Sequence, residues 1–146
     1  MVDVGGKPIA ERTAIAEAFV SVSRALARAI RRDELKKGNL LEVARLAGIQ
    51  GAKRTDELIP LCHSLPLDSV DVDAVLRPGR VHITATARTH ARTGVEMEAL
   101  TAVAVAALTV IDMGKAIDKA MTISGVRMLE KRGGRSGIYR AKDHHR

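Results

Sequence analysis

The fold class of this 146-residue chain follows from one stretch, VDVDAVLRPGRVHITATA at residues 70–87. Residues 70–76 and residues 81–87 each alternate apolar and polar side chains, which is the pattern of a β-strand with one buried face. The RPGR sequence at residues 77–80 is typical of a turn, so we expect the two strands to form an antiparallel hairpin.

Two short helices are expected before this hairpin. Ser23 is a suitable N-cap for a helix over residues 23–32, because its hydroxyl can accept a hydrogen bond from a free backbone N–H group. Asn39 can cap a second helix, LLEVARLAGI at residues 40–49, which Gly48 is expected to end.

A third helix is expected after the hairpin, from Glu96 to about Ile111, and it is apolar almost all round. Such a helix must be covered on several sides, so we expect a sheet on one side and another subunit on the other. A last strand, VRMLEK, follows at residues 126–131, whereas residues 11–22 fit either a helix or a strand. This order predicts an α+β fold in which helices cover an antiparallel sheet.

Composition excludes several classes of protein. The chain is one domain long and 46% hydrophobic, which is enough for a core. Phe19 and Tyr139 are its only aromatic residues, so a nucleic-acid binder that stacks bases is not expected. Cys62 is the only cysteine, which excludes a disulfide scaffold. No apolar run reaches the ~18–20 residues of a membrane span, and the N-terminus lacks a secretory signal, so we expect a soluble, cytoplasmic protein.

The positive charge is concentrated at the C-terminus. The net charge is +7, from 24 basic and 17 acidic residues, and the last sixteen residues, KRGGRSGIYRAKDHHR, hold six basic residues and one acidic residue. The GGRSG sequence predicts a mobile basic tail. From charge alone, a solubilising tail and an anion-binding segment are equally good interpretations.

Several polar residues stand where a plain core would not need them. Lys37 precedes a helix start, Lys53 precedes a short amphipathic turn, and His63 lies among apolar residues. Each is weak evidence alone, because a surface lysine or a structural histidine has the same appearance. Cys62 is expected to be a small buried hydrophobic residue rather than a nucleophile.

The clearest candidate is DMGKAIDK at residues 112–119, where an apolar helix suddenly acquires charges. Asp112 and Lys115 are three residues apart, so their side chains meet on one face of a helix. A lysine beside a carboxylate can act as a proton donor or a phosphate clamp. A structural ion pair at a helix end is the alternative, and spacing alone slightly favours it.

Taken together, six motifs resemble the MoaC family of molybdenum-cofactor biosynthesis, the cyclic pyranopterin monophosphate synthases. They are MVDV (1–4), KGN (37–39), AGIQGAKRT (47–55), ELIPLCH (57–63), RTGVEMEALTAVAVAALT (92–109) and DMGKAIDK (112–119). The resemblance implies one catalytic domain over residues 1–137, followed by a basic tail at 138–146. It also implies a ferredoxin-like α+β fold in which residues 11–22 are a strand, and a hexamer of three dimers with sites at subunit interfaces.

The same resemblance implies an activity. These enzymes rearrange 3′,8-cyclo-7,8-dihydro-GTP to cyclic pyranopterin monophosphate and release pyrophosphate, with no cofactor and no protein metal site. Asp112 and Lys115 match the catalytic pair. The matching basic residues, which bind the triphosphate or assist the chemistry, are Arg12, Lys37, Lys53 and Lys131. The residues that match the pterin and phosphate pocket are Leu61, Cys62, His63, Met97 and Glu98.

Two positions depart from the family pattern. Ser64 stands where the family usually has proline, and Gly114 where it usually has cysteine. We expect a less rigid segment after His63 and a looser turn before Lys115, since glycine within a helix costs ~1 kcal/mol relative to alanine.

The rival interpretations are a nucleic-acid-binding module and a catalytically silent paralogue. The first does not explain the Asp112–Lys115 pair, and the second is expected to have lost cationic residues.

Overall fold

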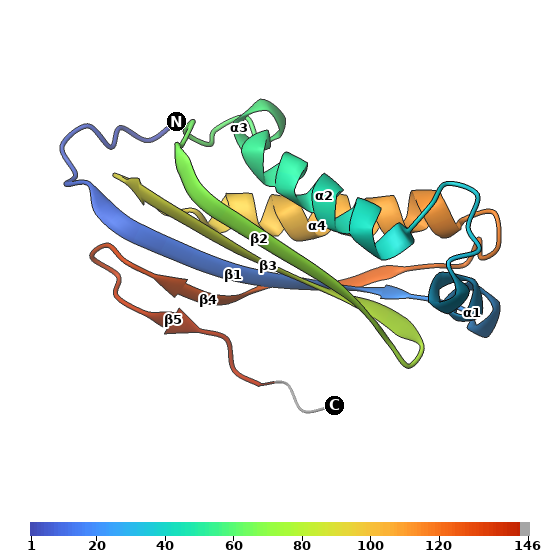
Figure 1. Cartoon of the computed structure of the whole chain (residues 1–146). Coiled ribbons are helices and arrows are strands. Elements are labelled where there is room, and N and C mark those ends of the chain that lie inside the picture. The colour runs from blue at the N-terminus through green and yellow to red at the C-terminus, as the bar shows by residue number, and fades with distance from the viewer. Residues whose placement is uncertain (144–146) are drawn as a thin grey trace.

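The computed structural model describes residues 1–143 and has a single antiparallel sheet with helices on one face (Figure 1). The sheet order is β2-β3-β1-β4-β5. The elements in chain order are β1 (Ala10–Ser21), α1 (Arg24–Arg32), α2 (Leu40–Lys53), α3 (Thr55–Leu58), β2 (Leu67–Arg77), β3 (Arg80–Ala91), α4 (Glu96–Gly114), β4 (Ile123–Arg132) and β5 (Tyr139–Arg140).

The expected hairpin is confirmed as β2 and β3, whose register pairs Arg77 with Arg80 across the turn. Residues 11–22, which fit either a helix or a strand, form β1 in the middle of the sheet, between β3 and β4. Every second residue of β1 from Ala14 to Val20 is buried under the helices, so the alanines there serve close sheet–helix packing.

The two predicted N-caps are confirmed. The hydroxyl of Ser23 accepts a hydrogen bond from Leu26 N–H at 3.1 Å, and the amide oxygen of Asn39 accepts one from Glu42 N–H at 3.1 Å. The predicted end of the second helix at Gly48 is wrong, because α2 continues to Lys53. Gly48 lies inside the helix, on the side that faces α4. A Cβ there would stand 2.9 Å from the carbonyl oxygen of Ala102, so the glycine allows α2 to approach α4 closely.

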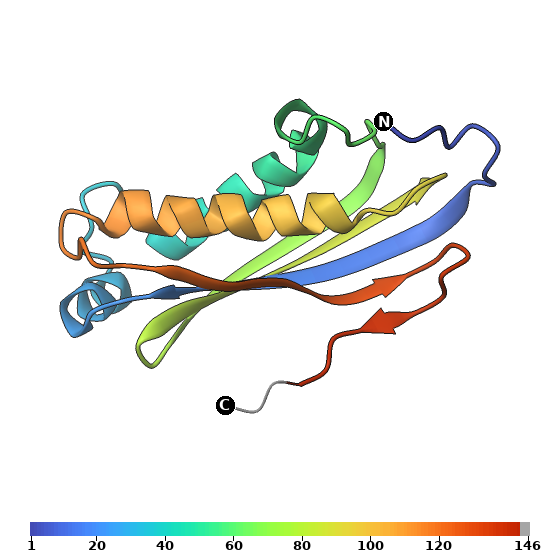
Figure 2. The same cartoon turned by 180° about the vertical axis from the view of Figure 1, so that it is seen from behind.

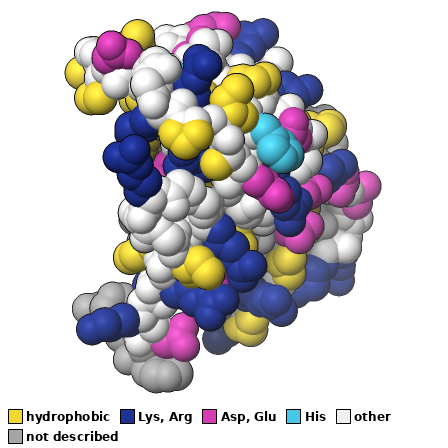
Figure 3. All heavy atoms as spheres, turned by 90° about the vertical axis from the view of Figure 1, so that its left-hand side faces the viewer, with side chains coloured by type: hydrophobic (Ala, Val, Ile, Leu, Met, Phe, Trp, Pro, Cys, Tyr) yellow, Lys and Arg dark blue, Asp and Glu magenta, His cyan; other side chains and the backbone are white. Residues whose placement is uncertain are grey.

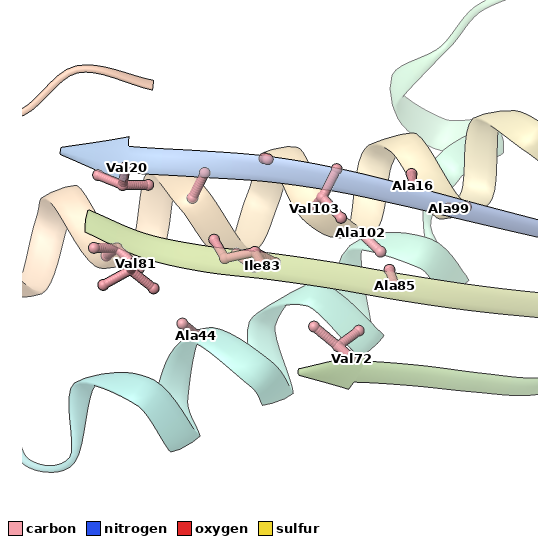
Figure 4. Close-up of a cluster of buried hydrophobic side chains, with 14 of the residues drawn as sticks. Ala16, Val20, Ala44, Val72, Val81, Ile83, Ala85, Ala99, Ala102 and Val103 are labelled. Atoms are coloured by element: carbon pink, nitrogen blue, oxygen red, sulfur yellow. The ribbon is translucent and has the colours of Figure 1, made fainter. Parts of the chain in front are cut away.

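The core lies between the sheet and the pair α2 and α4 (Figure 4). Val20, Val81 and Ile83 point from β1 and β3 towards the helices, and Ala102 and Val103 of α4 meet them. Small side chains bring the layers close together. Seen from behind, α4 runs along the sheet over most of its length (Figure 2).

Helix α4 bears on the expectation that the chain has no membrane span. Its 19 residues, with a mean hydropathy of 1.6 over the most apolar 18-residue window, are long and apolar enough to cross a bilayer by length and composition alone. More than half of that window is buried inside the molecule. A core helix covered by a sheet and a second helix accounts for this composition.

The mobile tail predicted from GGRSG is not what the structure shows for residues 133–137. These residues join β4 to β5, and β5 pairs with β4 through Lys131 and Tyr139 and through Glu130 and Arg140. The glycines are turn residues with positive φ, which explains why the sequence looked like a linker. Residues 144–146 of the expected tail lie outside the described residues.

Candidate functional site

The N-terminal end of α4 borders a hollow of about 530 Å³ that we call the basic hollow. Five cationic side chains and one carboxylate line it: Lys7, Arg12, Lys131, Arg132, Arg135 and Glu96. Lysine and arginine side chains are prominent on this end of the molecule (Figure 3). The excess of cations makes the hollow suitable for an anion with several negative charges.

Arg12 forms the floor of the basic hollow. Its Nε atom is buried and has no hydrogen-bond partner among the described residues, while Nη2 donates to the carbonyl oxygen of Arg92 at 3.4 Å. Gly133 and Gly134 pass so close to β1 that a Cβ at either position would overlap Glu11 or the Arg12 guanidinium. The glycine-rich turn therefore holds Arg12 in place, and only glycine fits there.

Lys131 and Glu96 form an ion pair at 2.5 Å in this hollow, with both side chains about 30% exposed. Glu96 begins α4, where a negative charge interacts favourably with the helix dipole. An incoming anion would compete with Glu96 for Lys131.

A second hollow of about 320 Å³ adjoins the first, and we call it the His63 hollow. The two share Lys7, Thr93, Gly94 and Glu96 in their walls. All five residues expected for the pterin and phosphate pocket line the His63 hollow: Leu61, Cys62, His63, Met97 and Glu98. The structure thus brings these five residues together from two chain segments, residues 61–63 and residues 97–98.

Glu98 is the buried carboxylate of the His63 hollow, with 5% of the residue exposed. Burial raises the pKa of Glu98 from 4.5 to about 7, and the nearby carboxylates of Glu96 and Asp56 act in the same direction. Burial, together with Glu98 and Asp56, also raises the pKa of the Cys62 thiol, so this cysteine is a poor nucleophile. Near neutral pH, Glu98 can either donate or accept a hydrogen bond.

The C-terminal end of α4 carries a different arrangement, the Asp112 cluster of Lys37, Asp112 and Lys115. Lys37 Nζ lies 2.8 Å from one carboxylate oxygen of Asp112, and Lys115 Nζ lies 3.0 Å from the other. Hydrogen bonds from Lys37 and Lys115 lower the pKa of Asp112. All three side chains are more than half exposed.

The predicted meeting of Asp112 and Lys115 is confirmed, and the structure adds Lys37 to the pair. The cluster is nevertheless remote from both hollows, since Glu98 and Asp112 are about 21 Å apart along α4 at 1.5 Å per residue. Lys53 belongs to neither group, because it lines a shallow apolar groove on the outer side of α2. Within one chain, the expected site residues therefore form two groups and one outlier.

Comparison with known proteins decides the family. The model of the MoaC family matches residues 1–134. The chain belongs to the MoaC family. Among its relatives, "Cyclic pyranopterin monophosphate synthase" of Rhodospirillum rubrum is 56% identical over 143 residues, covering 97% of this chain and 86% of the relative. The proteins of the same name from Parvibaculum lavamentivorans and Deinococcus radiodurans are each 53% identical, covering 97% and 98% of this chain and 90% and 85% of the relative.

The departures from the MoaC pattern have local explanations in the structure. Gly114 is buried at the end of α4, where a Cβ would stand 2.7 Å from a methyl carbon of Leu26 and 3.0 Å from Met121 Cε. The glycine leaves room for the ends of the Leu26 and Met121 side chains, and it lies directly before Lys115. Ser64 is exposed in the segment between α3 and β2.

Four residues that line the basic hollow were not assigned to the site from the sequence: Lys7, Glu96, Arg132 and Arg135. The KRGGRSG sequence carried a signal for the two arginines, since glycine-rich basic loops bind phosphates, but the signal is weak without a following helix. Lys7 gave no signal, because its place beside residues 93–96 depends on tertiary structure. Among residues 1–143, no three His, Cys, Asp or Glu side chains come together as a metal-ligand set.

Proposed function

We propose that this MoaC-family chain is a cyclic pyranopterin monophosphate synthase, which converts 3′,8-cyclo-7,8-dihydro-GTP to cyclic pyranopterin monophosphate and releases pyrophosphate. The observation that carries the proposal is the adjoining pair of hollows at the N-terminal end of α4. One is rich in cations and the other holds His63 and Glu98, which matches a substrate with a triphosphate at one end and a polar heterocycle at the other.

The basic hollow would bind the triphosphate. Five cations face one carboxylate there, and Glu96 is already paired with Lys131. A triphosphate carries several negative charges, and loss of pyrophosphate requires that the charge on the leaving group be neutralised. Arg12 is the strongest anchor, because its guanidinium is fixed beneath Gly133 and Gly134 and can bind phosphate oxygens in a bidentate manner.

The His63 hollow would hold the heterocycle. Glu98 is buried, and its pKa of about 7 allows it to donate to a ring carbonyl or accept from a ring N–H group. His63 offers a ring nitrogen on the opposite chain segment, while Leu61 and Met97 supply apolar contacts. Polar groups at fixed points in a partly apolar pocket are typical of small-molecule sites.

The Asp112 cluster would supply the catalytic group. Asp112 is ionised and contacts both lysines, so it orients Lys115 and Lys37 towards solvent from one end of α4. Lys115 is then a positioned ammonium group that can transfer a proton or stabilise charge at the phosphate. Lys53 would be a further cation for the phosphates.

Because the hollows and the Asp112 cluster lie at opposite ends of α4, we infer that a complete site needs two copies of the chain. Apolar residues of α2 and α4 remain exposed on the side away from the sheet, among them Leu46 at 56% and Leu108 at 58%. A second subunit would cover them, as the all-round apolar character of α4 suggests. We propose a ferredoxin-like catalytic domain at residues 1–137 that forms a hexamer of three dimers in the cytoplasm.

The test is turnover of 3′,8-cyclo-7,8-dihydro-GTP, followed by pyrophosphate release, for the natural chain and for Lys115→Ala. Lys142→Ala is the matched control, because Lys142 is exposed and lines neither hollow. We expect turnover by the natural chain and the control, and none by Lys115→Ala. A folded natural chain that binds the nucleotide but releases no pyrophosphate would support the silent-paralogue interpretation and overturn the proposal.

A further inference from the structure

The N-terminal segment, residues 1–9, lies against both hollows although it has no helix or strand. His63 Nε2 donates a hydrogen bond to the carbonyl oxygen of Val2 at 2.8 Å, and Val2 and Val4 are part of the wall of the His63 hollow. The segment is thus attached to the same histidine that is expected to contact substrate.

Local hydrogen bonds give this segment a defined course between Val2 and β1. Gly5 N–H donates to a carboxylate oxygen of Asp3 at 2.8 Å, and Lys7 N–H donates to the carbonyl oxygen of Val4 at 3.0 Å. The resulting turn brings Lys7 to the place where the two hollows meet, so that Lys7 lines both of them.

Lys7 differs from the paired lysines of the basic hollow and the Asp112 cluster, because it has no acidic partner among residues 1–143. Lys131 is paired with Glu96, and Lys37 and Lys115 are paired with Asp112. Lys7 forms no ion pair with any of residues 1–143. An anion that reaches Lys7 therefore displaces only water, whereas an anion that reaches Lys131 must compete with a carboxylate.

We propose that Lys7 is a further substrate-binding residue, which holds phosphate oxygens at the junction of the two hollows, and that the contact between Val2 and His63 positions it there. The inference rests on the proposed function. An ammonium group suits this place, because it is a compact charge with three donors that can serve several phosphate oxygens. The phosphate nearest the heterocycle must pass this junction if the two parts of the substrate occupy adjoining hollows.

The same contact fixes the orientation of His63. A carbonyl oxygen only accepts hydrogen bonds, so Nε2 carries the proton. In the neutral ring, Nδ1 is then the acceptor. Loss of the segment would free the ring to rotate, and Val2 is in this sense a positioning residue that acts through its main chain.

The experiment measures binding of inorganic pyrophosphate by calorimetry, together with KM and kcat for the nucleotide. Lys7→Gln removes the charge with little change of shape, Lys7→Arg keeps the charge, and Lys142→Gln is the matched control. We expect about tenfold weaker pyrophosphate binding and a raised KM for Lys7→Gln, with kcat little changed, since one charge-assisted contact contributes about 1.4 kcal/mol. Lys7→Arg should regain most of the affinity.

A shortened chain that lacks residues 2–4 tests the positioning role. If the contact with His63 places Lys7, this deletion should weaken pyrophosphate binding, and Lys7→Gln should add little further loss in the shortened chain. Equal affinities for Lys7→Gln and Lys142→Gln would overturn the role of Lys7, and fully additive losses would overturn the positioning role. Absence of both binding and turnover in the natural chain would instead contradict the proposed function itself.

Discussion

The two ends of α4 present carboxylates in opposite surroundings. Glu98, in the first turn, is buried beside other carboxylates, and its pKa is raised to about 7. Asp112, near the last turn, is exposed between two lysines, and its pKa is lowered. Glu98 has no cationic partner among residues 1–143, whereas Asp112 contacts two lysines, so that its cluster has one positive charge in excess.

This difference assigns different chemistry to the two ends. A carboxyl group that changes protonation near pH 7 is suited to recognise a heterocycle with both donors and acceptors. A carboxylate that stays ionised is suited to orient cations. On the proposed function, the heterocycle pocket and the catalytic lysine lie at different ends of α4.

The largest expected effect comes from mixing two inactive variants, one from each end. Lys115→Ala and His63→Ala should each abolish turnover alone. Co-expression with two affinity tags and isolation of doubly tagged hexamers should restore about one quarter of the natural activity, because about half of the dimers within these hexamers are hybrids and each hybrid has one intact site of two. Pyrophosphate release by the purified hybrids is the measurement.

The matched control mixes two variants from the same end, Lys115→Ala and Lys37→Ala. Every shared site in such a hybrid carries one of the two changes, so no activity should return. Restoration in the control, or its absence in the first mixture, would show that the two ends of α4 do not complete each other across subunits.

A smaller effect is expected for stability as a function of pH. Below pH 4.5, Glu98 is protonated in the folded and unfolded chains. Between pH 4.5 and about 7 the unfolded chain releases this proton while the folded chain keeps it, so the free energy of unfolding falls as pH rises. Glu98→Gln removes this loss of stability at high pH. The variant should be more stable by about 2 kcal/mol at pH 8 and by nothing at pH 4. The figure is below the full value of the pKa shift because the hollow is open to solvent.

Asp112→Asn is the control from the other end of the helix, and its effect should have the opposite sign. The lowered pKa of Asp112 adds stability above its ordinary pKa of 3.8, which is lost as pH falls. Because the side chain is exposed, the effect should be small. Urea unfolding of both variants at pH 4 and pH 8 gives the comparison, and a Glu98→Gln difference that does not depend on pH would contradict the burial argument.

Much of this arrangement could be predicted from the sequence because it depends on local patterns. The alternation at residues 70–87 gave the hairpin, Ser23 and Asn39 gave the helix starts, and the three-residue spacing gave the pair of Asp112 and Lys115. Residues 11–22 were ambiguous because small alanines suit a helix as well as a central strand under close-packed helices. Only the neighbours of β1 decide between them.

The remaining site features depend on contacts between distant segments. The burial of Glu98 and the contact of Val2 with His63 both join parts of the chain that lie far apart in the sequence. The tail looked mobile because glycine-rich sequences serve linkers and tight turns alike. Its packing over Arg12 required knowledge of where β1 lies beside β4.

The smallest expected effect concerns the spacer between the two ends. The two ends of α4 stay at a fixed separation only if the helix is held in place. Helix α2 packs against it at Gly48, where a Cβ would stand 2.9 Å from the Ala102 carbonyl oxygen. Gly48→Ala should destabilise the protein by about 1 kcal/mol, because overpacking against a main-chain atom outweighs the gain in helix propensity. Gly114→Ala is the control, since the obstructing atoms there are the ends of Leu26 and Met121, which can move aside. Urea midpoints at one protein concentration provide the measurement. A Gly48→Ala variant as stable as the natural chain would mean that α2 and α4 separate easily. In that case α2 would not hold α4 and its two ends in a fixed position.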